Sequence, residues 1–202
     1  MSVKLKICGL RRVEDIRIIN ETLPTYAGFV FAQSKRQIDL NTALILKEQL
    51  DQRIQTVGVF VDSTIENIVN IVASGAINLI QLHGNENQQY ISQLRERVNI
   101  EIIKALRVNN STIYDFKSAS YLLLDSGGGS GKTFDWTSVP KLKKPFFLAG
   151  GISIDNMSEA IESFNPYALD ISSSVETNGF KDYQKILEFS NKLKKLNGEY
   201  DE

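Results

Sequence analysis

Cysteine and histidine are nearly missing from this chain of 202 residues, which contains one of each. A single cysteine cannot form an internal disulfide or a thiolate metal cluster, and a single histidine cannot supply a histidine-rich metal site. We therefore expect neither a bound metal nor an internal disulfide. This use of cysteine fits the reducing environment of the cytoplasm, which is the compartment we predict.

Long apolar runs and an excess of charge are also missing. No apolar run approaches the roughly 20 residues that are needed to span a bilayer, and the lysine-containing start of the chain does not resemble a signal peptide. A formal net charge of −1 gives no electrostatic reason to expect nucleic acid or an acidic membrane as a partner. No Pro- or Ser-rich linker divides the sequence, so we expect one soluble globular domain over residues 1–202.

The sequence does contain eight short apolar runs of strand composition. They lie at Lys4–Cys8, Ala27–Phe31, Thr56–Val61, Leu79–His83, Glu101–Leu106, Tyr121–Asp125, Phe146–Ala149 and Ala168–Ser172. Their starts are roughly 20 to 30 residues apart, which is the length of a strand and a covering helix. This α/β alternation predicts a single-domain (β/α)8 TIM barrel, and an open doubly wound sheet, which usually has fewer strands, is the alternative.

Segments with helical periodicity separate the predicted strands. A capping box at Ser63–Glu66 predicts one helix start, and Leu44, Lys47 and Leu50 are expected to share one face of the helix before it. The last helix is predicted over Phe180–Leu196 with Tyr183 on its buried stripe, and the tail Lys192–Glu202 is expected to fray. The segment after the fifth strand has a weak helical pattern, so its helix is expected to be short or absent.

A glycine-rich stretch, residues 126–131, follows the sixth predicted strand. Asp125 ends that strand, so its carboxylate is expected at the carboxyl tip, beside a loop that can close over a ligand. Gly131–Thr133 is similar to the end of a nucleotide phosphate loop. That motif needs a glycine where Ser126 stands and a helix directly afterwards, which Pro140 disfavours. We therefore predict a lid over the site and not a nucleoside triphosphatase.

Polar residues gather at the predicted strand tips. Because residues two apart share one face of a strand, the inward-facing set near the carboxyl end is polar: Lys6, Cys8, Gln81, His83, Asp125 and Asp170. A barrel filled only for packing would carry Val, Ile and Leu at these positions. We interpret this polar set as an active site.

Two later loops have phosphate-binding character. The loops after the seventh and eighth strands of this fold commonly hold a phosphate through backbone amides. A Gly-Gly pair follows the seventh predicted strand and a serine run ends the eighth. We predict a phosphate site from these loops and from amides of the lid, formed by Gly127, Gly128, Gly150, Gly151, Ser172, Ser173 and Ser174.

Recognisable motifs stand at the tip of almost every predicted strand. They are Lys6–Leu10, Gly28–Phe31 with Ser34–Arg36, Gly58–Val61, Gln81–Gly84, Leu124–Ser126, Gly131–Trp136, Ala149–Ile152 and Asp170–Ser173. In this order, and over nearly the whole chain, they resemble the phosphoribosylanthranilate isomerase family. The resemblance implies a (β/α)8 barrel of tryptophan biosynthesis that needs no cofactor or metal. Its reaction is the Amadori rearrangement of N-(5-phosphoribosyl)anthranilate to 1-(2-carboxyphenylamino)-1-deoxyribulose 5-phosphate.

The resemblance also implies roles for individual residues. Asp125 matches the general acid, Cys8 the general base, and Arg36 the arginine that receives the anthranilate carboxylate. We expect His83 and Asp170 to belong to the substrate site as well, although a purely structural hydrogen bond is an equal reading of His83. A free carboxyl group is ionised at neutral pH and a free thiol is mostly protonated, so Asp125 and Cys8 both need perturbed pKa values.

Lys6 offers a positive charge one step below Cys8 on the same strand face. We hypothesise that Lys6 favours the thiolate of Cys8 and that Asp170, on the neighbouring last strand, pairs with Lys6 so that its charge is not buried alone.

Two residues depart from the family pattern. Lys35 stands where a proline is common, so the second loop is expected to be less rigid. Ser174 replaces a common glycine and would be strained if its φ were positive.

Other phosphosugar barrels and a non-catalytic protein are the alternatives. Indole-glycerol-phosphate synthase chemistry needs a lysine acid where this chain offers Cys8 and Asp125, and pentose-phosphate epimerases need a metal and histidines. A barrel that binds a phosphosugar without turnover, or with a different specificity, stays open, as does a second activity on a related aminoaldose phosphate. The helical faces show no long apolar excess, so we expect a monomer.

Overall fold

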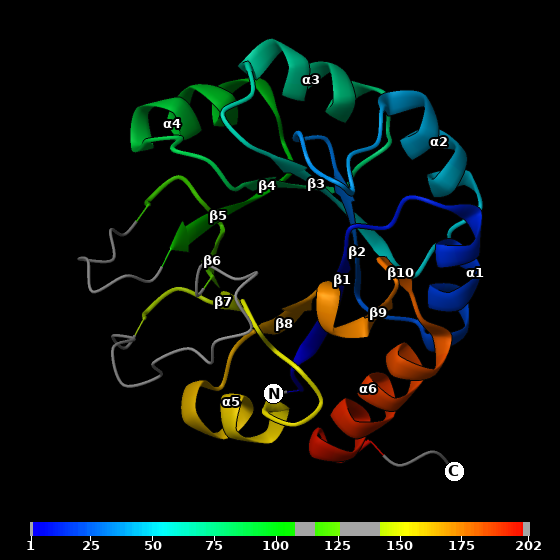
Figure 1. The fold of residues 1–202 in the computed structure, drawn as a ribbon. Helices are drawn as coiled ribbons and strands as arrows, with labels where there is room; N and C mark the ends of the chain where they lie inside the picture. Colours follow the sequence, from blue (N-terminus) through cyan, green and yellow to red (C-terminus); the bar gives the residue numbers. More distant parts are fainter. Residues whose placement is uncertain (1, 108–115, 126–141, 200–202) are drawn as a thin grey trace.

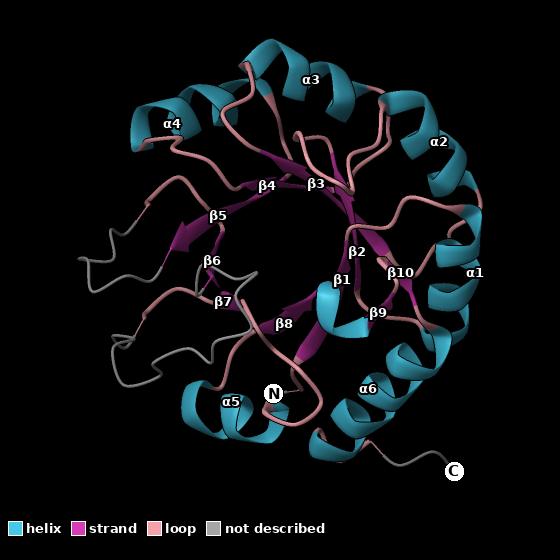
Figure 2. Cartoon of the chain, viewed as in Figure 1, coloured by secondary structure: helices cyan, strands magenta, loops and turns pink. Residues whose placement is uncertain are grey.

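Eight parallel strands close into a barrel, and the six α-helices of the described residues lie outside it (Figures 1 and 2). The computed structural model describes residues 2–107, 116–125 and 142–199. Neighbours along the chain are also neighbours in the sheet, from β1 to β8, and β8 pairs with β1. The predicted TIM barrel is thus confirmed. Residues 116–120, the described part of the β5–β6 connection, contain no helix.

The strands of the barrel are β1 (Lys4–Cys8), β2 (Tyr26–Val30), β3 (Gln55–Phe60), β4 (Leu79–Leu82), β5 (Glu101–Arg107), β6 (Tyr121–Asp125), β7 (Phe146–Ala149) and β8 (Ala168–Ile171). The helices are α1 (Val13–Thr22), α2 (Leu40–Glu48), α3 (Ile65–Ala73), α4 (Gln88–Arg97), α5 (Met157–Phe164) and α6 (Tyr183–Leu196). A 3-10 turn η2 (Ser173–Val175) and a hairpin of β9 (Glu176–Thr177) and β10 (Phe180–Lys181) precede α6. Each strand bound agrees with its prediction to within one residue.

The strands serve two hydrophobic cores because their side chains alternate in direction. Outward-facing residues such as Ile80, Leu122 and Leu148 pack with the helices in the larger core. Inward-facing residues fill the barrel itself, among them Val57, Leu79, Ile103, Leu123 and Phe147. The apolar strand composition that predicted the fold is therefore explained by burial on both faces.

Aromatic rings close the amino end of the barrel. Phe147 lies 5.4 Å from the ring of Tyr26 and 5.6 Å from the rings of Tyr121 and Tyr167. The Tyr167 hydroxyl accepts a hydrogen bond from Lys4 Nζ at 2.6 Å and lies 3.0 Å from the Tyr26 hydroxyl. Since these rings stand at the beginnings of their strands, a ligand has to enter from the carboxyl end.

Two helix predictions differ from the structure, one in the face that is buried and one in the position of the cap. Leu44 is 36% exposed, whereas Ala43 and Leu46 are buried. Asp39 caps α2 by accepting a hydrogen bond from Thr42 N at 2.8 Å. In α3 the cap is Thr64, which accepts from the Asn67 amide at 3.3 Å, so the predicted capping box at residues 63–66 is one residue early.

The start of α6 also differs from its prediction. Phe180 and Lys181 belong to β10, which pairs with β9, and Asp182 caps the helix by accepting from Lys185 N at 3.2 Å. Tyr183 is consequently 42% exposed and not on the buried stripe. A pattern of apolar spacing does not detect a short hairpin, because both arrangements place the same residues close to the core.

The expectation of a frayed tail from Lys192 was likewise wrong. Leu193 is buried, and α6 continues to Leu196. Asn197 then accepts from Val3 N at 2.8 Å and donates to Val3 O at 3.0 Å, so it joins the end of the helix to the entry of β1. None of the described helices is long and apolar enough to cross a membrane.

We predict that Phe147→Ala lowers the free energy of unfolding by about 3–5 kcal/mol, because it leaves a cavity among three tyrosine rings. Urea denaturation measures the change. Ile45→Ala is the matched control: Ile45 is 54% exposed on α2, and its truncation should change the free energy of unfolding by no more than about 0.5 kcal/mol. Equal effects of the two variants would contradict the assigned core.

Candidate active site

A cavity of about 780 Å³ lies at the carboxyl ends of the strands. All predicted site residues that the structure describes line this cavity: Cys8, Arg36, His83, Asp125, Gly150, Gly151, Asp170, Ser172, Ser173 and Ser174. Gly127 and Gly128, together with the predicted lid, lie outside the described residues. Residues from the three strands β1, β6 and β8 and from the loops after β2, β4, β7 and β8 thus meet in one space.

A buried ion pair lies below the thiol of Cys8. Lys6 is fully buried, and its Nζ donates to both carboxylate oxygens of Asp170 at 2.9 Å. Burial raises the pKa of the Cys8 thiol, the charge of Lys6 lowers it, and the charge of Asp170 raises it, with burial the largest contribution. Lys6 therefore acts in the hypothesised direction, but without substrate it does not outweigh burial.

Gly28 explains how the thiol is accommodated. β1 and β2 pair with Cys8 opposite Gly28, and a Cβ atom added to Gly28 would lie 2.7 Å from the Cys8 Sγ and 2.9 Å from its Cα. No side chain fits there without displacement of the strand. The sequence showed Gly28 only as part of a motif and gave no signal for this contact.

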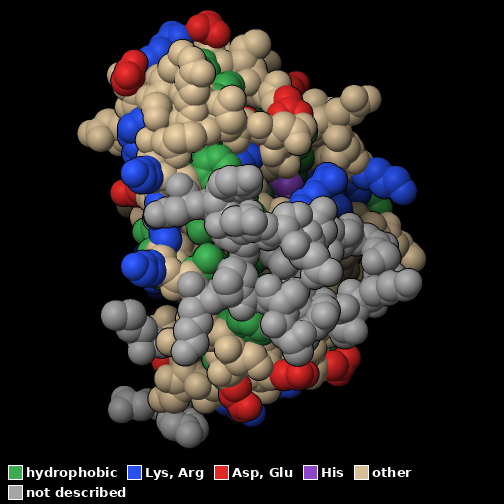
Figure 3. Space-filling model, turned by 90° about the vertical axis from the view of Figure 1, so that its left-hand side faces the viewer, with side chains coloured by type: hydrophobic (Ala, Val, Ile, Leu, Met, Phe, Trp, Pro, Cys, Tyr) green, Lys and Arg blue, Asp and Glu red, His purple; other side chains and the backbone are tan. Residues whose placement is uncertain are grey.

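His83 joins β4 to the proposed acid. Its Nε2 lies 3.2 Å from Asp125 Oδ2, and its Nδ1 lies 2.8 Å from Gln81 Nε2. The histidine side chain, purple in Figure 3, is visible in a recess beside Lys and Arg side chains. His83 therefore both lines the cavity and makes structural hydrogen bonds, so the two readings of this residue are compatible.

Arg36 is held by a partner that sequence reasoning missed. Its Nε and Nη2 donate to the two carboxylate oxygens of Glu176 at 2.8 and 2.7 Å. Glu176 also accepts from the buried Lys181 at 2.8 Å, and Lys181 donates to the Ser172 carbonyl at 2.9 Å. Burial alone would raise the pKa of Glu176, but its bonds to Arg36 and Lys181 lower it to about 2.

Glycines in the loop after β7 have the backbone conformation that their residue type permits. Gly150 and Gly151 have φ angles of 82° and 73°, which few other residues adopt. Ser174 is not among the residues with positive φ, so the expected strain does not arise. Ser172 uses its hydroxyl to donate to the Cys8 carbonyl at 2.9 Å, which ties the tip of β8 to the tip of β1.

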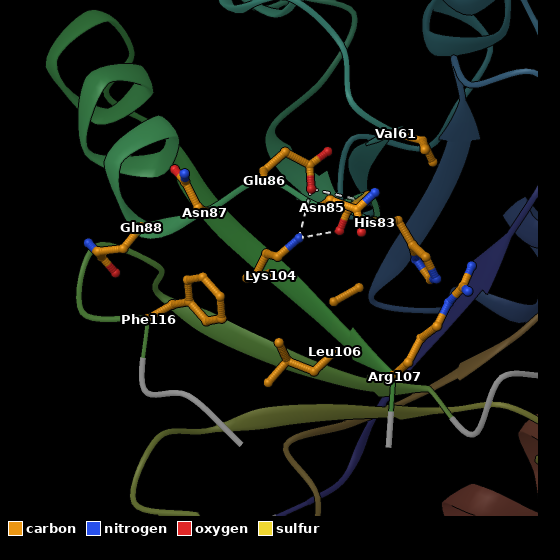
Figure 4. A pocket seen from close by; sticks show the side chains of 12 residues that line it. Val61, His83, Asn85, Glu86, Asn87, Gln88, Lys104, Leu106, Arg107 and Phe116 are labelled. Carbon is orange, nitrogen blue, oxygen red and sulfur yellow. Dashed lines mark hydrogen bonds and ion pairs between the residues drawn. The ribbon is translucent and has the colours of Figure 1, made fainter. Parts of the chain in front are cut away.

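A second pocket, of about 710 Å³, lies beside the first and shares Val61 and His83 with it. Figure 4 shows Lys104 pointing to Glu86 and to the backbone of Gly84, and its Nζ donates to each at 2.7 Å. Lys104 and Glu86 are both buried and satisfy one another, so this pair stabilises the loop after β4. Across the described ranges, no group of three or more His, Cys, Asp and Glu residues is placed to hold a metal ion.

A family model described as N-(5'-phosphoribosyl)anthranilate (PRA) isomerase matches residues 5–192. The chain belongs to the phosphoribosylanthranilate isomerase family. An N-(5'-phosphoribosyl)anthranilate isomerase of Endomicrobium trichonymphae is 48% identical over 198 residues, which cover 96% of this chain and 99% of that protein. All motifs that carried the resemblance lie within the matched range.

Solved structures of this family have the same fold. Phosphoribosyl anthranilate isomerase from Thermotoga maritima is 33% identical, with a TM-score of 0.84 over 96% of this chain and 99% of that chain. That enzyme is described as dimeric. Another family structure is a complex with reduced 1-(o-carboxyphenylamino)-1-deoxyribulose 5-phosphate. It is 31% identical, with a TM-score of 0.79 over 96% of this chain and 99% of that one.

We predict opposite shifts of the Cys8 pKa when either member of the buried pair is neutralised. Lys6→Met should raise the pKa because it removes the favourable charge, and Asp170→Asn should lower it because it removes the unfavourable one. The rate of thiol alkylation as a function of pH reads Cys8 alone, since the chain has one cysteine. Circular dichroism controls for folding. An unchanged Cys8 pKa in both folded variants would show that Lys6 and Asp170 do not influence the thiol.

We also predict that Glu176 contributes to stability in a pH-dependent way. Its pKa in the folded chain is about 2, below its ordinary value. The contribution is therefore fully present above the unfolded pKa and is lost as the pH falls from about 5 towards 2. Glu176→Gln should flatten this part of the curve of unfolding free energy against pH. Glu66→Gln serves as the control variant, because Glu66 forms an exposed ion pair with Arg97 and its replacement should change the curve less than Glu176→Gln does.

Proposed function

We propose that this chain converts N-(5-phosphoribosyl)anthranilate to 1-(2-carboxyphenylamino)-1-deoxyribulose 5-phosphate, an Amadori rearrangement of tryptophan biosynthesis. Family membership supports the reaction. The observation that carries it is that Cys8 and Asp125, from strands on different sides of the barrel, line one cavity with both phosphate loops. A thiol and a carboxyl group are sufficient for a reaction that moves only protons.

Asp125 acts as the general acid in the first step. Its carboxyl proton goes to the furanose ring oxygen, the bond between C1′ and that oxygen breaks, and the anthranilate nitrogen lone pair forms a C=N bond. The product is a protonated Schiff base, and Asp125 becomes a carboxylate. His83 beside Asp125 supplies a hydrogen-bond partner for that carboxylate.

Cys8 acts as the general base in the second step. The thiolate takes the C2′ proton, the C–H electrons form a C1′=C2′ bond, and the C=N electrons return to nitrogen. The resulting enolamine loses its 2′-hydroxyl proton and gains a proton at C1′ to give the ketone. Burial raises the pKa of free Cys8, so the cationic Schiff base, together with Lys6, favours the thiolate at the moment when it is needed.

Arg36 and the last two loops hold the ends of the substrate. Glu176 occupies Nε and Nη2 of Arg36, which leaves Nη1 to donate to the anthranilate carboxylate. We assign the phosphate to backbone amides of Gly150, Gly151, Ser173 and Ser174. Ser172 contributes through its backbone, because its hydroxyl donates a hydrogen bond to the backbone carbonyl of Cys8.

The remaining predictions concern the ligand, the oligomeric state, the location and the domain assignment. A family structure binds a reduced analogue of the product, which supports a phosphorylated anthranilate derivative as the small-molecule ligand of this chain. The monomeric state stays a prediction to be measured by sedimentation, since one relative is dimeric. Cytoplasmic location and the assignment of residues 1–202 to one domain also stay predictions.

We expect purified protein to consume freshly made phosphoribosylanthranilate, followed by the loss of substrate fluorescence. Cys8→Ala and Asp125→Asn should each lower kcat by about 10² to 10⁴, because each removes one proton-transfer group. Ile45→Ala, far from the cavity on α2, should keep wild-type activity. Tight binding without turnover by the wild type would instead support the non-catalytic phosphosugar-binding alternative.

A further inference from the structure

We propose that Gln81 is a positioning residue that selects the tautomer of His83, and that His83 thereby decides which oxygen of Asp125 carries the acid proton. The inference rests on the proposed function in one respect: it takes Asp125 as the general acid. Under this proposal, Gln81 and His83 support the reaction without contact to the reacting atoms of the substrate.

The three side chains form a continuous hydrogen-bonded chain. Gln81 is 1% exposed and lies inside the barrel, two residues before His83. Its Nε2 is 2.8 Å from His83 Nδ1, and His83 Nε2 is 3.2 Å from Asp125 Oδ2. Both nitrogens of the imidazole ring are therefore in contact with a neighbour, so protonation of one nitrogen constrains the hydrogen bond of the other.

The amide nitrogen of Gln81 can only donate a hydrogen bond. His83 Nδ1 must then accept, and a neutral imidazole carries its one proton on Nε2. That N–H donates to Asp125 Oδ2, which makes Oδ2 an acceptor in both protonation states of the carboxyl group. The acid proton of Asp125 accordingly resides on Oδ1.

The rotated amide would have the opposite effect. Gln81 Oε1 would accept from a proton on Nδ1, and the lone pair of His83 Nε2 would face Asp125. The acid proton would then lie on Oδ2 and be shared with His83, away from the substrate. The orientation of one buried amide thus separates a productive acid from an unproductive one.

The orientation in which the Gln81 amide nitrogen faces His83 has a cost inside the barrel. Gln81 Oε1 is buried and has no hydrogen-bond partner among the described residues. An unpaired buried acceptor costs about 1–3 kcal/mol. The contacts of Gln81 Nε2 with His83 and of His83 with Asp125 offset this cost.

The tautomer can be read directly because His83 is the only histidine of the chain. In 15N-labelled protein, the two ring nitrogens give one set of signals, and protonated and unprotonated nitrogens differ strongly in chemical shift. We expect wild-type protein to carry the proton on Nε2. Gln81→Met, which keeps the volume but removes the donor, should give a mixture of tautomers. Gln81→Glu should move a proton to Nδ1, because its carboxylate only accepts.

The effects on kcat and KM distinguish a positioning role of Gln81 from a role in substrate binding. Gln81→Met should lower kcat about tenfold with little change in KM, which corresponds to about 1.4 kcal/mol in the activation free energy. His83→Gln places an amide near the position of Nε2 and should retain more activity than His83→Leu, which offers no donor. Thermal melts of all variants control for folding.

Three results would overturn the proposal. The first is a wild-type proton on Nδ1, a result that needs no variant to fold. The second is a Gln81→Met protein whose tautomer and kcat are both unchanged, and the third is a fall in kcat without any change of tautomer. Absence of turnover in the wild type would refute the isomerase function and the acid-proton assignment, whereas the ring signals test the Gln81–His83 contact without substrate.

Discussion

The ion pair of Lys6 and Asp170 lies at the seam where the last strand of the barrel meets the first. The two residues are also partners in the register of β1 and β8. Unpairing a fully buried lysine is costly, about 3–5 kcal/mol where one partner is removed. A slip of this register by one residue would turn Asp170 outward and leave Lys6 alone. The pair therefore fixes how the barrel closes, and closure sets the positions of Cys8 and of the loop after β8.

Fixed charges then extend from this seam around the mouth of the cavity. Lys181 binds the carbonyl of Ser172 and the carboxylate of Glu176, and Glu176 holds one edge of Arg36. Under the proposed function, the substrate carboxylate would meet an arginine whose position is already set, so less conformational entropy would be lost on binding. The loops after β2 and β8 are thus joined by side chains, although they are distant in sequence.

The sequence was sufficient for the barrel, its strands and many of the residues that line the cavity, because strand tips and side-chain alternation are local properties. It could not reveal Glu176 as the partner of Arg36, since nothing local marks a contact between residues 140 positions apart. Lys181 was hidden because the pattern around it suits a helix as well as the hairpin that is observed. The tyrosine cluster around Phe147 likewise depends on closure of the barrel.

The close approach of Gly28 to Cys8 limits which residue can stand at position 28. The space around the Cys8 sulfur is bounded by a bare backbone on β2, and a methyl group there would already collide with it. A side chain at position 28 would need β1 or β2 to retreat, which the hydrogen bonds of the closed barrel oppose. Any replacement of Gly28 during evolution would therefore have required the neighbouring strand β1 to change with it.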